Sequence, residues 1–257
     1  MQKSFDRIKI LGIEVNPVSI EELNSYINIC MEHGISHVIA NHNIHSIYLF
    51  HKSELLRGFY KRADVIHIDG MPLVKWAKLL GLTVKNKQRV TYVDWIHPLM
   101  REAESKKWLV YFVGGREETG NRAAEKLKKL YPALEIRTSN GYFEFGSEEE
   151  RKTIHDINLN KPNILMVGMG MPRQEMWISR NITNLSANVI LPVGACMDYV
   201  AGEVPTPPRW LGNAGLEWMF RLKTEPVRLA KRYLVEPWSL IPWMIRDLSR
   251  KGRTFND

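Results

Sequence analysis

The chain has 257 residues, of which 44% are hydrophobic and 25% charged, a composition that excludes a disordered protein. A formal net charge of +8 predicts an anionic partner such as a nucleotide, a phosphate, a nucleic acid or an acidic lipid surface. No apolar run reaches the ~18 to 20 residues that span a bilayer, and residues 1–7 lack the apolar core of a signal peptide. Cys30 and Cys196 match no zinc or disulfide spacing. We therefore expect a cytoplasmic protein, soluble or peripheral to a membrane, with buried thiols.

Strands and helices alternate along the first 200 residues. Ser19 and Glu22 form a capping box for a helix that Gly34 ends, and Ser53 divides a later helical region. In chain order we expect a strand or hairpin arm at 8–15, a helix at 19–34, a strand at 37–41, two helices up to 62, a strand at 64–70, a helix at 71–80, a basic loop at 85–89, a helix from 91 or 94 to 107, a strand at 108–113, a helix to 130, a strand at 134–139, a helix at 148–158, a strand at 164–167, a helix after 171 and a strand at 189–193. This alternation predicts an α/β fold with a mainly parallel, Rossmann-like sheet flanked by helices.

The last fifty residues differ from the rest. From Arg209 onward there are ten Lys or Arg against five Asp or Glu, four of the eight tryptophans, and prolines that predict short helices. We predict a core at 1–202 and a short helical appendage at 203–257. Its composition suits a helix at a membrane interface, although core packing of the tryptophans is an equal alternative. Nucleic-acid binding lacks a recognised motif.

Polar residues follow two of the predicted strands. Asp69 and Gly70 end an apolar strand, where the sheet of an α/β protein binds its ligands, so Asp69 is the candidate reacting group. The alternative is that Asp69 caps the helix from Met71. Asn41 and Asn43 follow the preceding strand, where their amides can bind sugar hydroxyls or a base, or cap the next helix.

A metal site is the weaker interpretation of this region. His42, His45, His67 and Asp69 contain ligand types, but their spacing at a strand end does not match a zinc motif. We therefore predict no metal ligands and no cofactor.

Glycine-rich turns follow two other strands. Gly168 and Gly170 precede Pro172, which suits a first helical turn, and free N–H groups there favour a diphosphate. Arg173 replaces the third glycine of the dinucleotide fingerprint, so a tight turn between strand and helix is an equal alternative. Gly114 lies in a similar, weaker turn.

A basic cluster lies in the appendage. Arg228, Lys231 and Arg232 fall on one helical face, and Arg221 precedes them. They are candidates for binding an anion, and the alternative is a solvated charged face.

Taken together, these segments resemble the WecG/TagA/CpsF family of bacterial glycosyltransferases over about residues 10–233. The motifs that carry the resemblance are Asn41-x-Asn43, Asp69-Gly70-Met71, Arg89-Val90-Thr91, Val113-Gly114-Gly115, Gly168-Met169-Gly170-Met171-Pro172-Arg173-Gln174-Glu175, Gly194-Ala195-Cys196-Met197-Asp198, Pro208-Arg209-Trp210, Gly215-Leu216-Glu217-Trp218, Arg221-Leu222, Arg228 and Arg232-Tyr233-Leu234. The chain departs from the family pattern at Asn41, where many members have Thr, and at Cys196-Met197.

The resemblance implies an inverting transferase, without a metal motif, that moves a sugar from a UDP-sugar to a polyprenyl-diphosphate-linked saccharide. Such enzymes work peripherally at the cytoplasmic face of the membrane, in exopolysaccharide, capsule, teichoic-acid or common-antigen synthesis. It implies a hexosyl- or N-acetylhexosaminyltransferase whose partners are the donor, the acceptor and an anionic membrane surface, without nucleic acid, and it leaves a homo-oligomer open.

The expected roles follow from chemistry and resemblance together. Asp69, Asn43 and Arg89 are the candidate catalytic residues: Asp69 is expected to act as the general base, Asn43 to hold the sugar or nucleotide, and Arg89 to contact a phosphate. The donor is expected to contact Asn41, Gly114, Gly168, Gly170, Gln174 and Asp198. Arg221, Arg228 and Lys231 are expected to bind the diphosphate or the acceptor. The alternatives are a nucleotide-binding oxidoreductase and a non-catalytic, basic membrane- or nucleic-acid-binding protein.

Overall fold

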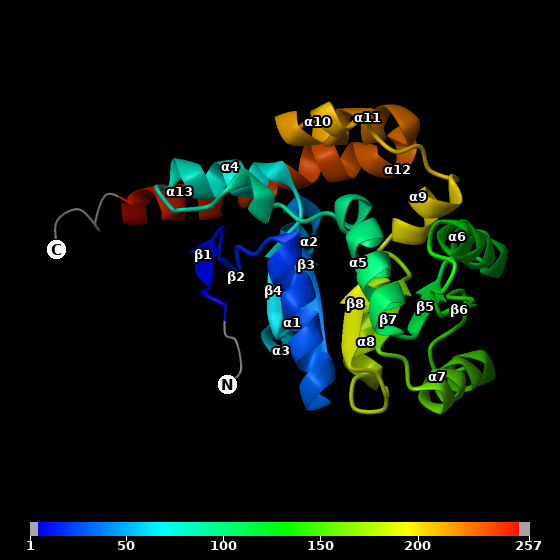
Figure 1. Ribbon diagram of the computed structural model, residues 1–257. Helices are drawn as coiled ribbons and strands as arrows, with labels where there is room; N and C mark the ends of the chain where they lie inside the picture. The colour runs from blue at the N-terminus through cyan, green and yellow to red at the C-terminus, as the bar shows by residue number, and fades with distance from the viewer. Residues whose placement is uncertain (1–4, 252–257) are drawn as a thin grey trace.

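A six-stranded, all-parallel sheet forms the centre of the computed structural model, which describes residues 5–251 (Figure 1). The strand order is β4-β3-β8-β7-β5-β6. The strands are β3 (His37–His42), β4 (Val65–Ile68), β5 (Val110–Gly114), β6 (Ile136–Ser139), β7 (Ile164–Gly168) and β8 (Val189–Pro192). The predicted parallel sheet is confirmed, and residues 8–15 form a separate antiparallel hairpin of β1 (Ile8–Ile10) and β2 (Ile13–Val15).

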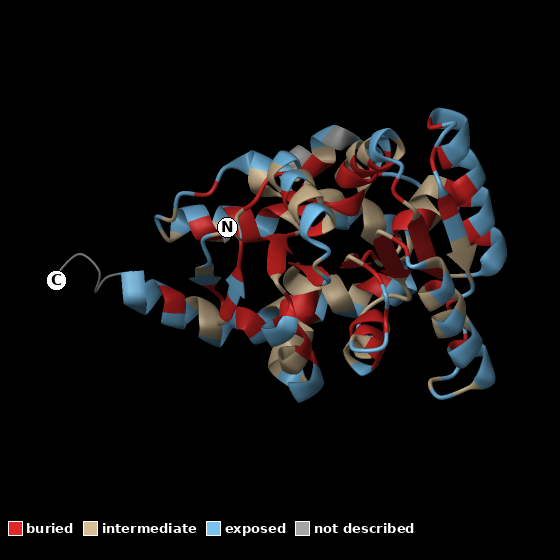
Figure 2. Cartoon of the chain, turned by 60° about the horizontal axis from the view of Figure 1, so that its bottom comes forward, coloured by how far each residue is buried: buried red, intermediate tan, exposed pale blue. Residues whose placement is uncertain are grey.

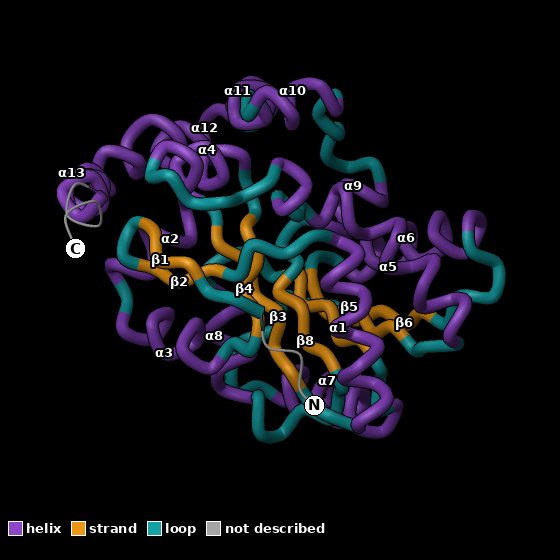
Figure 3. Tube along the Cα trace, turned by 60° about the vertical axis from the view of Figure 1, so that its left-hand side comes forward, coloured by secondary structure: helices purple, strands orange, loops and turns teal. Residues whose placement is uncertain are grey.

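Helices cover both faces of the sheet, as the view in Figure 3 shows. One face packs on α1 (Ile20–His33), α5 (Tyr92–Lys106), α6 (Glu117–Leu130) and α9 (Cys196–Ala201). The other face packs on α2 (Ile44–Lys52), α3 (Glu54–Arg62), α7 (Glu148–Asn160) and α8 (Arg173–Asn181). Strand residues alternate between the two, so Phe112 faces the first set of helices and Tyr111 the second.

Local capping signals set the helix ends as predicted. Ser19 and Glu22 form the capping box of α1, and Gly34 ends that helix in a left-handed conformation. Ser53 caps α3, and Thr91 caps α5. Two details differ from the prediction. The basic loop contains a short 3₁₀ helix, η1 (Asn86–Gln88), and Pro172 precedes α8 instead of lying in its first turn.

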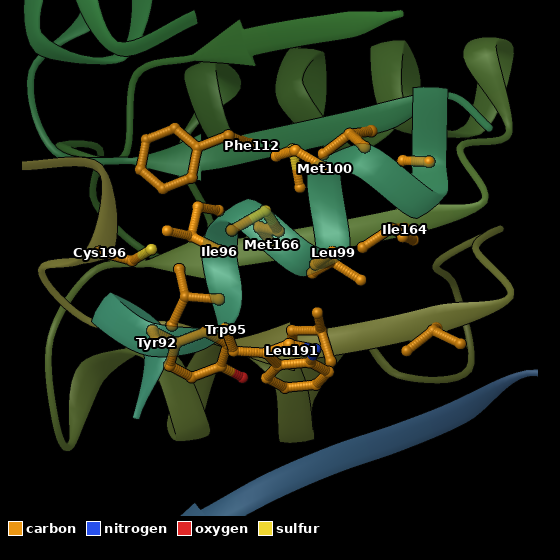
Figure 4. Close-up of a cluster of buried hydrophobic side chains, with 14 of the residues drawn as sticks. Tyr92, Trp95, Ile96, Leu99, Met100, Phe112, Ile164, Met166, Leu191 and Cys196 are labelled. Atoms are coloured by element: carbon orange, nitrogen blue, oxygen red, sulfur yellow. The ribbon is translucent and has the colours of Figure 1, made fainter. Parts of the chain in front are cut away.

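Helix α5 packs an apolar face on the first face of the sheet. Its residues at 92, 95, 96, 99 and 100 have the spacing of one helical face and pack on β5, β7 and β8 (Figure 4). Trp95 and Leu99 are fully buried, and each such side chain stabilises the fold by about 2 to 3 kcal/mol. This packing fixes the first turn of α5 beside the carboxyl ends of the strands.

The appendage lies across that carboxyl edge of the sheet (Figure 1). Its elements are α10 (Arg209–Ala214), α11 (Glu217–Thr224), α12 (Pro226–Ala230), the π turn η2 (Lys231–Val235), the 3₁₀ helix η3 (Glu236–Leu240) and α13 (Ile241–Lys251). The prolines of this segment predicted short helices, and the structure contains them. Pro226 begins α12, and Pro237 lies in η3. The domain border at residues 202 and 203 stays a prediction, and residues 1–4 and 252–257 lie outside the described part of the chain.

The appendage is tied to the core through α4 (Met71–Leu79) and the hairpin. The buried Asp247 accepts hydrogen bonds from the Leu11 amide at 2.7 Å and from the Trp76 indole at 3.0 Å. The Trp243 ring stacks on His51 at 4.1 Å. Trp238, in contrast, is 70% exposed. In Figure 2 the strands are mostly buried, and the outer faces of the helices are exposed.

Gly114 gives a test of the close approach of β5 and β7. A methyl group at Gly114 would lie 2.4 Å from the carbonyl oxygen of Gly168. We expect Gly114→Ala to lower the free energy of unfolding by roughly 3 kcal/mol, because neither backbone can move without breaking the ladder. Chemical denaturation measures the effect.

Gly58→Ala is the matched control. Gly58 lies inside α3 with open space where a methyl group would be added. This substitution should be neutral or stabilise the protein by up to about 1 kcal/mol. Equal unfolding midpoints for the two variants would contradict the close approach.

Candidate active site

The candidate site lies at two neighbouring strands from which the chain continues to opposite faces of the sheet. β3 pairs with β8, and the helices that follow them lie on opposite faces of the sheet. A crevice opens at the carboxyl ends of such strands. Here it is a cavity of about 450 Å³, which we call the strand-end cavity. Its walls come from residues that follow β3, β4, β7 and β8, from the start of α5, and from the appendage.

Asp69 enters this cavity from the end of β4. Its Oδ2 accepts hydrogen bonds from the side-chain amides of Asn41 at 3.1 Å and Asn43 at 3.3 Å. Within residues 5–251, no hydrogen bond reaches Oδ1. Burial raises the pKa of Asp69, and the bond from Asn43 and the charge of Arg221 oppose that rise. The carboxylate is therefore held through Oδ2, and it lines the cavity with Oδ1 free of hydrogen bonds from the described residues.

The structure shows which of the strand-end residues cap a helix. Asp69 does not cap α4, whose N-cap is Gly70 without a side-chain hydrogen bond. Asn43 caps α2 through its Oδ1, as one alternative predicted, and its Nδ2 binds Asp69. Asn41 does not act as a cap, and its buried Oδ1 has no partner among the described residues. A buried hydrogen-bond acceptor without a partner, in the wall of a cavity, indicates that a ligand supplies a hydrogen-bond donor there.

Basic side chains of the appendage form the opposite wall. Arg221, Arg228, Lys231 and Arg232 all line the strand-end cavity. Among the described residues, three of them, Arg221, Lys231 and Arg232, form no ion pair with a carboxylate. Arg228 is paired with Glu225 through two bonds of 2.6 and 2.7 Å. Three cations without a carboxylate partner give this wall a positive charge that attracts anions.

Other polar contacts hold the wall in place. Arg221 donates to the Tyr199 hydroxyl at 2.7 Å, and its guanidinium lies 5.3 Å from the centre of the Tyr199 ring. His45 and Glu236 form a hydrogen bond of 2.5 Å between α2 and η3. Tyr199 and this pair also line the cavity. They join parts of the chain that are far apart in sequence.

Arg89 lies outside the cavity and links the core to the appendage. Its guanidinium binds Asp94 at 2.8 Å and Glu217 at 3.1 Å. Glu217 itself lines the cavity. The contact of Arg89 with a phosphate stays a prediction. In the structure, Arg89 also holds α11 against the core through its ion pair with Glu217.

A buried pair of polar side chains lies behind the cavity. The Gln174 side chain accepts from the Gly194 amide at 3.0 Å and donates to Glu175 at 2.8 Å. Gln174 lines the cavity, together with Gly170. Burial raises the pKa of Glu175 to about 7, and its second oxygen has no partner among the described residues. Glu175 thus supports the amide that positions the turn after β8.

Three of the predicted donor contacts do not line the cavity. Gly114 and Gly168 lie where β5 and β7 approach each other, and added methyl groups would meet Gly168 and Phe112. Asp198 lies in the first turn of α9, and burial raises its pKa. Their contact with a donor stays a prediction.

The histidines near Asp69 have structural partners. Burial lowers the pKa of His42 and of His67 to about 3, so both rings are neutral. His42 bonds to Ser46 and packs on Tyr60. The His67 ring packs edge-on against Tyr92 and Trp95 of α5, and neither of its nitrogens has a hydrogen-bond partner among the described residues. Within residues 5–251, no group of three or more His, Cys, Asp or Glu side chains is arranged to hold a metal ion.

A family model described as "Glycosyl transferase WecG/TagA/CpsF family" matches residues 8–254. The chain belongs to this family. The family resemblance and the glycosyltransferase class predicted from the sequence are thereby confirmed, and the oxidoreductase and non-catalytic alternatives are not supported.

Two relatives carry a more specific name. A Bacillus spizizenii protein is 30% identical over 166 residues, which cover 65% of this chain and 63% of the relative. A Staphylococcus aureus protein is 23% identical over 229 residues, or 88% of this chain and 87% of the relative. Both are named N-acetylglucosaminyldiphosphoundecaprenol N-acetyl-beta-D-mannosaminyltransferase. The matched region spans slightly less than two thirds of the Bacillus protein.

Several residues that line the cavity were not predicted from the sequence to do so. Arg232 belongs to the predicted basic cluster but was given no role. His45 was considered only as a metal ligand. Glu236 and Tyr199 were not identified, because their contacts with His45 and Arg221 join segments 191 and 22 residues apart.

Glu175→Gln tests the buried pair. The raised pKa means that the neutral carboxyl stabilises the fold fully below about pH 4.5, and that this contribution is lost as the pH rises through about 7. Relative to Glu175→Gln, the parent protein should lose roughly 3 kcal/mol of stability between these pH values. Denaturant titrations at several pH values measure the difference, with the exposed Glu125→Gln as control. Parallel curves for parent and Glu175→Gln would refute it.

Proposed function

We propose that this protein is an inverting glycosyltransferase that moves a sugar from a UDP-sugar to a polyprenyl-diphosphate-linked saccharide without a metal ion. The observation that carries the proposal is the arrangement of Asp69 in the strand-end cavity. One carboxylate oxygen faces a space whose opposite wall bears Arg221, Lys231 and Arg232 without carboxylate partners. A base and an anion site on opposite sides of one cavity suit a displacement at an anomeric carbon.

Asp69 acts as the general base in this proposal. Its Oδ1 takes the proton from the acceptor hydroxyl as that oxygen forms a bond to the anomeric carbon. The bond from this carbon to the diphosphate breaks at the same time, and UDP leaves with the electron pair. Burial raises the pKa of Asp69, which strengthens it as a base, and the two amides fix its orientation.

The leaving diphosphate gains negative charge as the bond breaks. Arg221, Arg228 and Lys231 offset that charge, and Arg232 adds a further cation. Gly170 offers its backbone at the turn before α8. Arg89, Gly114, Gly168 and Asp198 remain proposed contacts, in support of the phosphate or of the donor.

The names of the relatives support a choice of substrates. We propose N-acetylmannosamine as the transferred sugar and a polyprenyl-diphosphate-linked N-acetylglucosamine as the acceptor, since both occur in those names. Asn41 and Gln174 hold the donor sugar from the side of the sheet. The product then belongs to the synthesis of a cell-surface polysaccharide.

A lipid-linked acceptor requires contact with a membrane, which we propose the appendage makes at the cytoplasmic face. No helix among the described residues is long and apolar enough to cross a bilayer. Ile241, Ile245 and Leu248 lie at helical spacing on α13 and are exposed, as is Trp238 in η3. Such a face inserts into the headgroup region. A homo-oligomer stays a prediction.

Asp69→Asn tests the role of the base. We expect turnover to fall by about 10² to 10⁴-fold while the fold is kept, because the amide cannot take the proton. The assay is UDP release from a panel of UDP-sugars that includes UDP-N-acetylmannosamine, with and without a short-chain polyprenyl-diphosphate N-acetylglucosamine, in detergent and EDTA.

Asp64→Asn is the matched control at the other end of β4. Asp64 accepts a hydrogen bond from the Val38 amide, and an asparagine oxygen can replace that acceptor. This variant should keep near-normal turnover. Full activity of Asp69→Asn would exclude Asp69 as the base, and absence of acceptor-dependent release from every donor would count against the proposed reaction.

The membrane contact is tested with a double substitution of Trp238 and Ile245 to Ser. These side chains are 70% and 62% exposed, so the fold should not change. We expect roughly 10- to 100-fold weaker partitioning to anionic vesicles in flotation assays. The control replaces Leu130 and Leu159 with Ser, which are equally exposed on α6 and α7. Equal partitioning of the two double variants would refute the assignment.

A further inference from the structure

A second cavity lies on the other side of Asp69. It measures about 400 Å³, within the range of small-molecule sites, and we call it the α4 cavity. Most of its walls are apolar, and they come from α4 and from the appendage, which lie side by side in Figure 1. The main apolar residues are Met71, Trp76, Trp218, Tyr233, Leu240 and Met244.

The two cavities share one wall. The residues that line both are Asn43, His45, Asp69, Glu217, Arg221 and Arg232. Asp69 therefore stands between a space with an anion site and a space with apolar walls. Arg228 and Lys231 line only the strand-end cavity. The Asp69 carboxylate thus marks the boundary between a cavity with basic walls and a cavity with mostly apolar walls.

The shared wall also carries a second sign of an anionic ligand. The Nε of Arg232 is buried and has no hydrogen-bond partner among the described residues. Arg221 next to it pairs with no described carboxylate and donates only to the Tyr199 hydroxyl. A charged group that enters the α4 cavity would meet these two guanidinium groups at its mouth.

We propose that the α4 cavity binds the first isoprenyl units of the acceptor, with the acceptor diphosphate at Arg221 and Arg232. This inference rests on the proposed function. A sugar on that diphosphate would extend from the two arginines toward Asp69, whose Oδ1 would take the proton from the acceptor hydroxyl. Arg228 and Lys231, which line only the strand-end cavity, then bind the donor diphosphate, and Arg221 and Arg232, which line both cavities, lie between the two diphosphates. The isoprenyl units, the diphosphate and the sugar of one amphiphilic molecule thus match, in this order, the apolar wall, the two arginines and the base.

The outer side of the same segment fits this occupant. Tyr233, Leu240 and Met244 face the cavity, whereas Leu234 and Trp238, between them in sequence, are exposed. An isoprenyl chain drawn from a membrane would therefore remain in contact with apolar side chains. A uridine ring between Trp218 and Tyr233 is the competing occupant, and it would place the donor here instead.

Calorimetry with farnesyl diphosphate, inorganic diphosphate and UDP tests the proposal without turnover. Farnesyl diphosphate should bind the parent protein at least tenfold more tightly than inorganic diphosphate, because each buried methylene strengthens binding about fourfold. Met244→Trp fills the cavity and should weaken farnesyl diphosphate at least tenfold while UDP binding stays within twofold. Met219→Trp is the control, since Met219 is exposed on α11 and lines neither cavity.

Three results would overturn the assignment. These are equal affinity for farnesyl and inorganic diphosphate, unchanged farnesyl diphosphate binding in Met244→Trp, and a loss of UDP binding in that variant, which would assign the cavity to the nucleotide. If Met244→Trp does not fold, a photoreactive farnesyl diphosphate on the parent protein decides the question. Labelling within residues 71–76 and 233–244 supports the proposal, and labelling confined to residues 170–199 refutes it.

Discussion

The pairing of β3 with β4 places one carboxylate beside two amides, and the chemistry of both cavities depends on this placement. The register aligns His42 with Ile68, so Asn43 and Asp69 leave the sheet side by side. A slip of one residue would turn every side chain of the strand to the other face. Because both strands are buried, core packing opposes such a slip. The core of the protein thus determines where the Asp69 carboxylate lies.

The appendage completes the site with charge of the opposite sign. Taking the Asp69 carboxylate out of water is costly, and Arg221 partly offsets that cost. The cations of the appendage are themselves close together and repel one another, as the lowering of the Arg232 pKa by burial and by Arg221 reflects. An anionic ligand relieves this repulsion. The same residues therefore make the empty site electrostatically unfavourable and the occupied site favourable.

Local signals made much of the site predictable. Asp69, Asn41 and Asn43 were found because strand ends and caps are visible in short windows of sequence. Gly114 and Gly168 were found as special positions, but the close pairing of β5 with β7 depends on distant residues. Arg89 pairs with Glu217 across 128 positions. The direction of the Arg232 side chain could not be derived from α-helical spacing, because residues 231–235 form a π turn.

Both cavities have one wall before residue 202 and another after residue 209, so neither exists unless the appendage is seated. The fraction of molecules in which the appendage packs on the core then scales the affinity of each cavity. An appendage that is packed for ~10% of the time weakens ligand binding in either cavity about tenfold. A ligand that bridges the two walls raises this fraction. Two ligands, one in each cavity, would consequently favour each other's binding through the position of one chain segment, even where they do not touch.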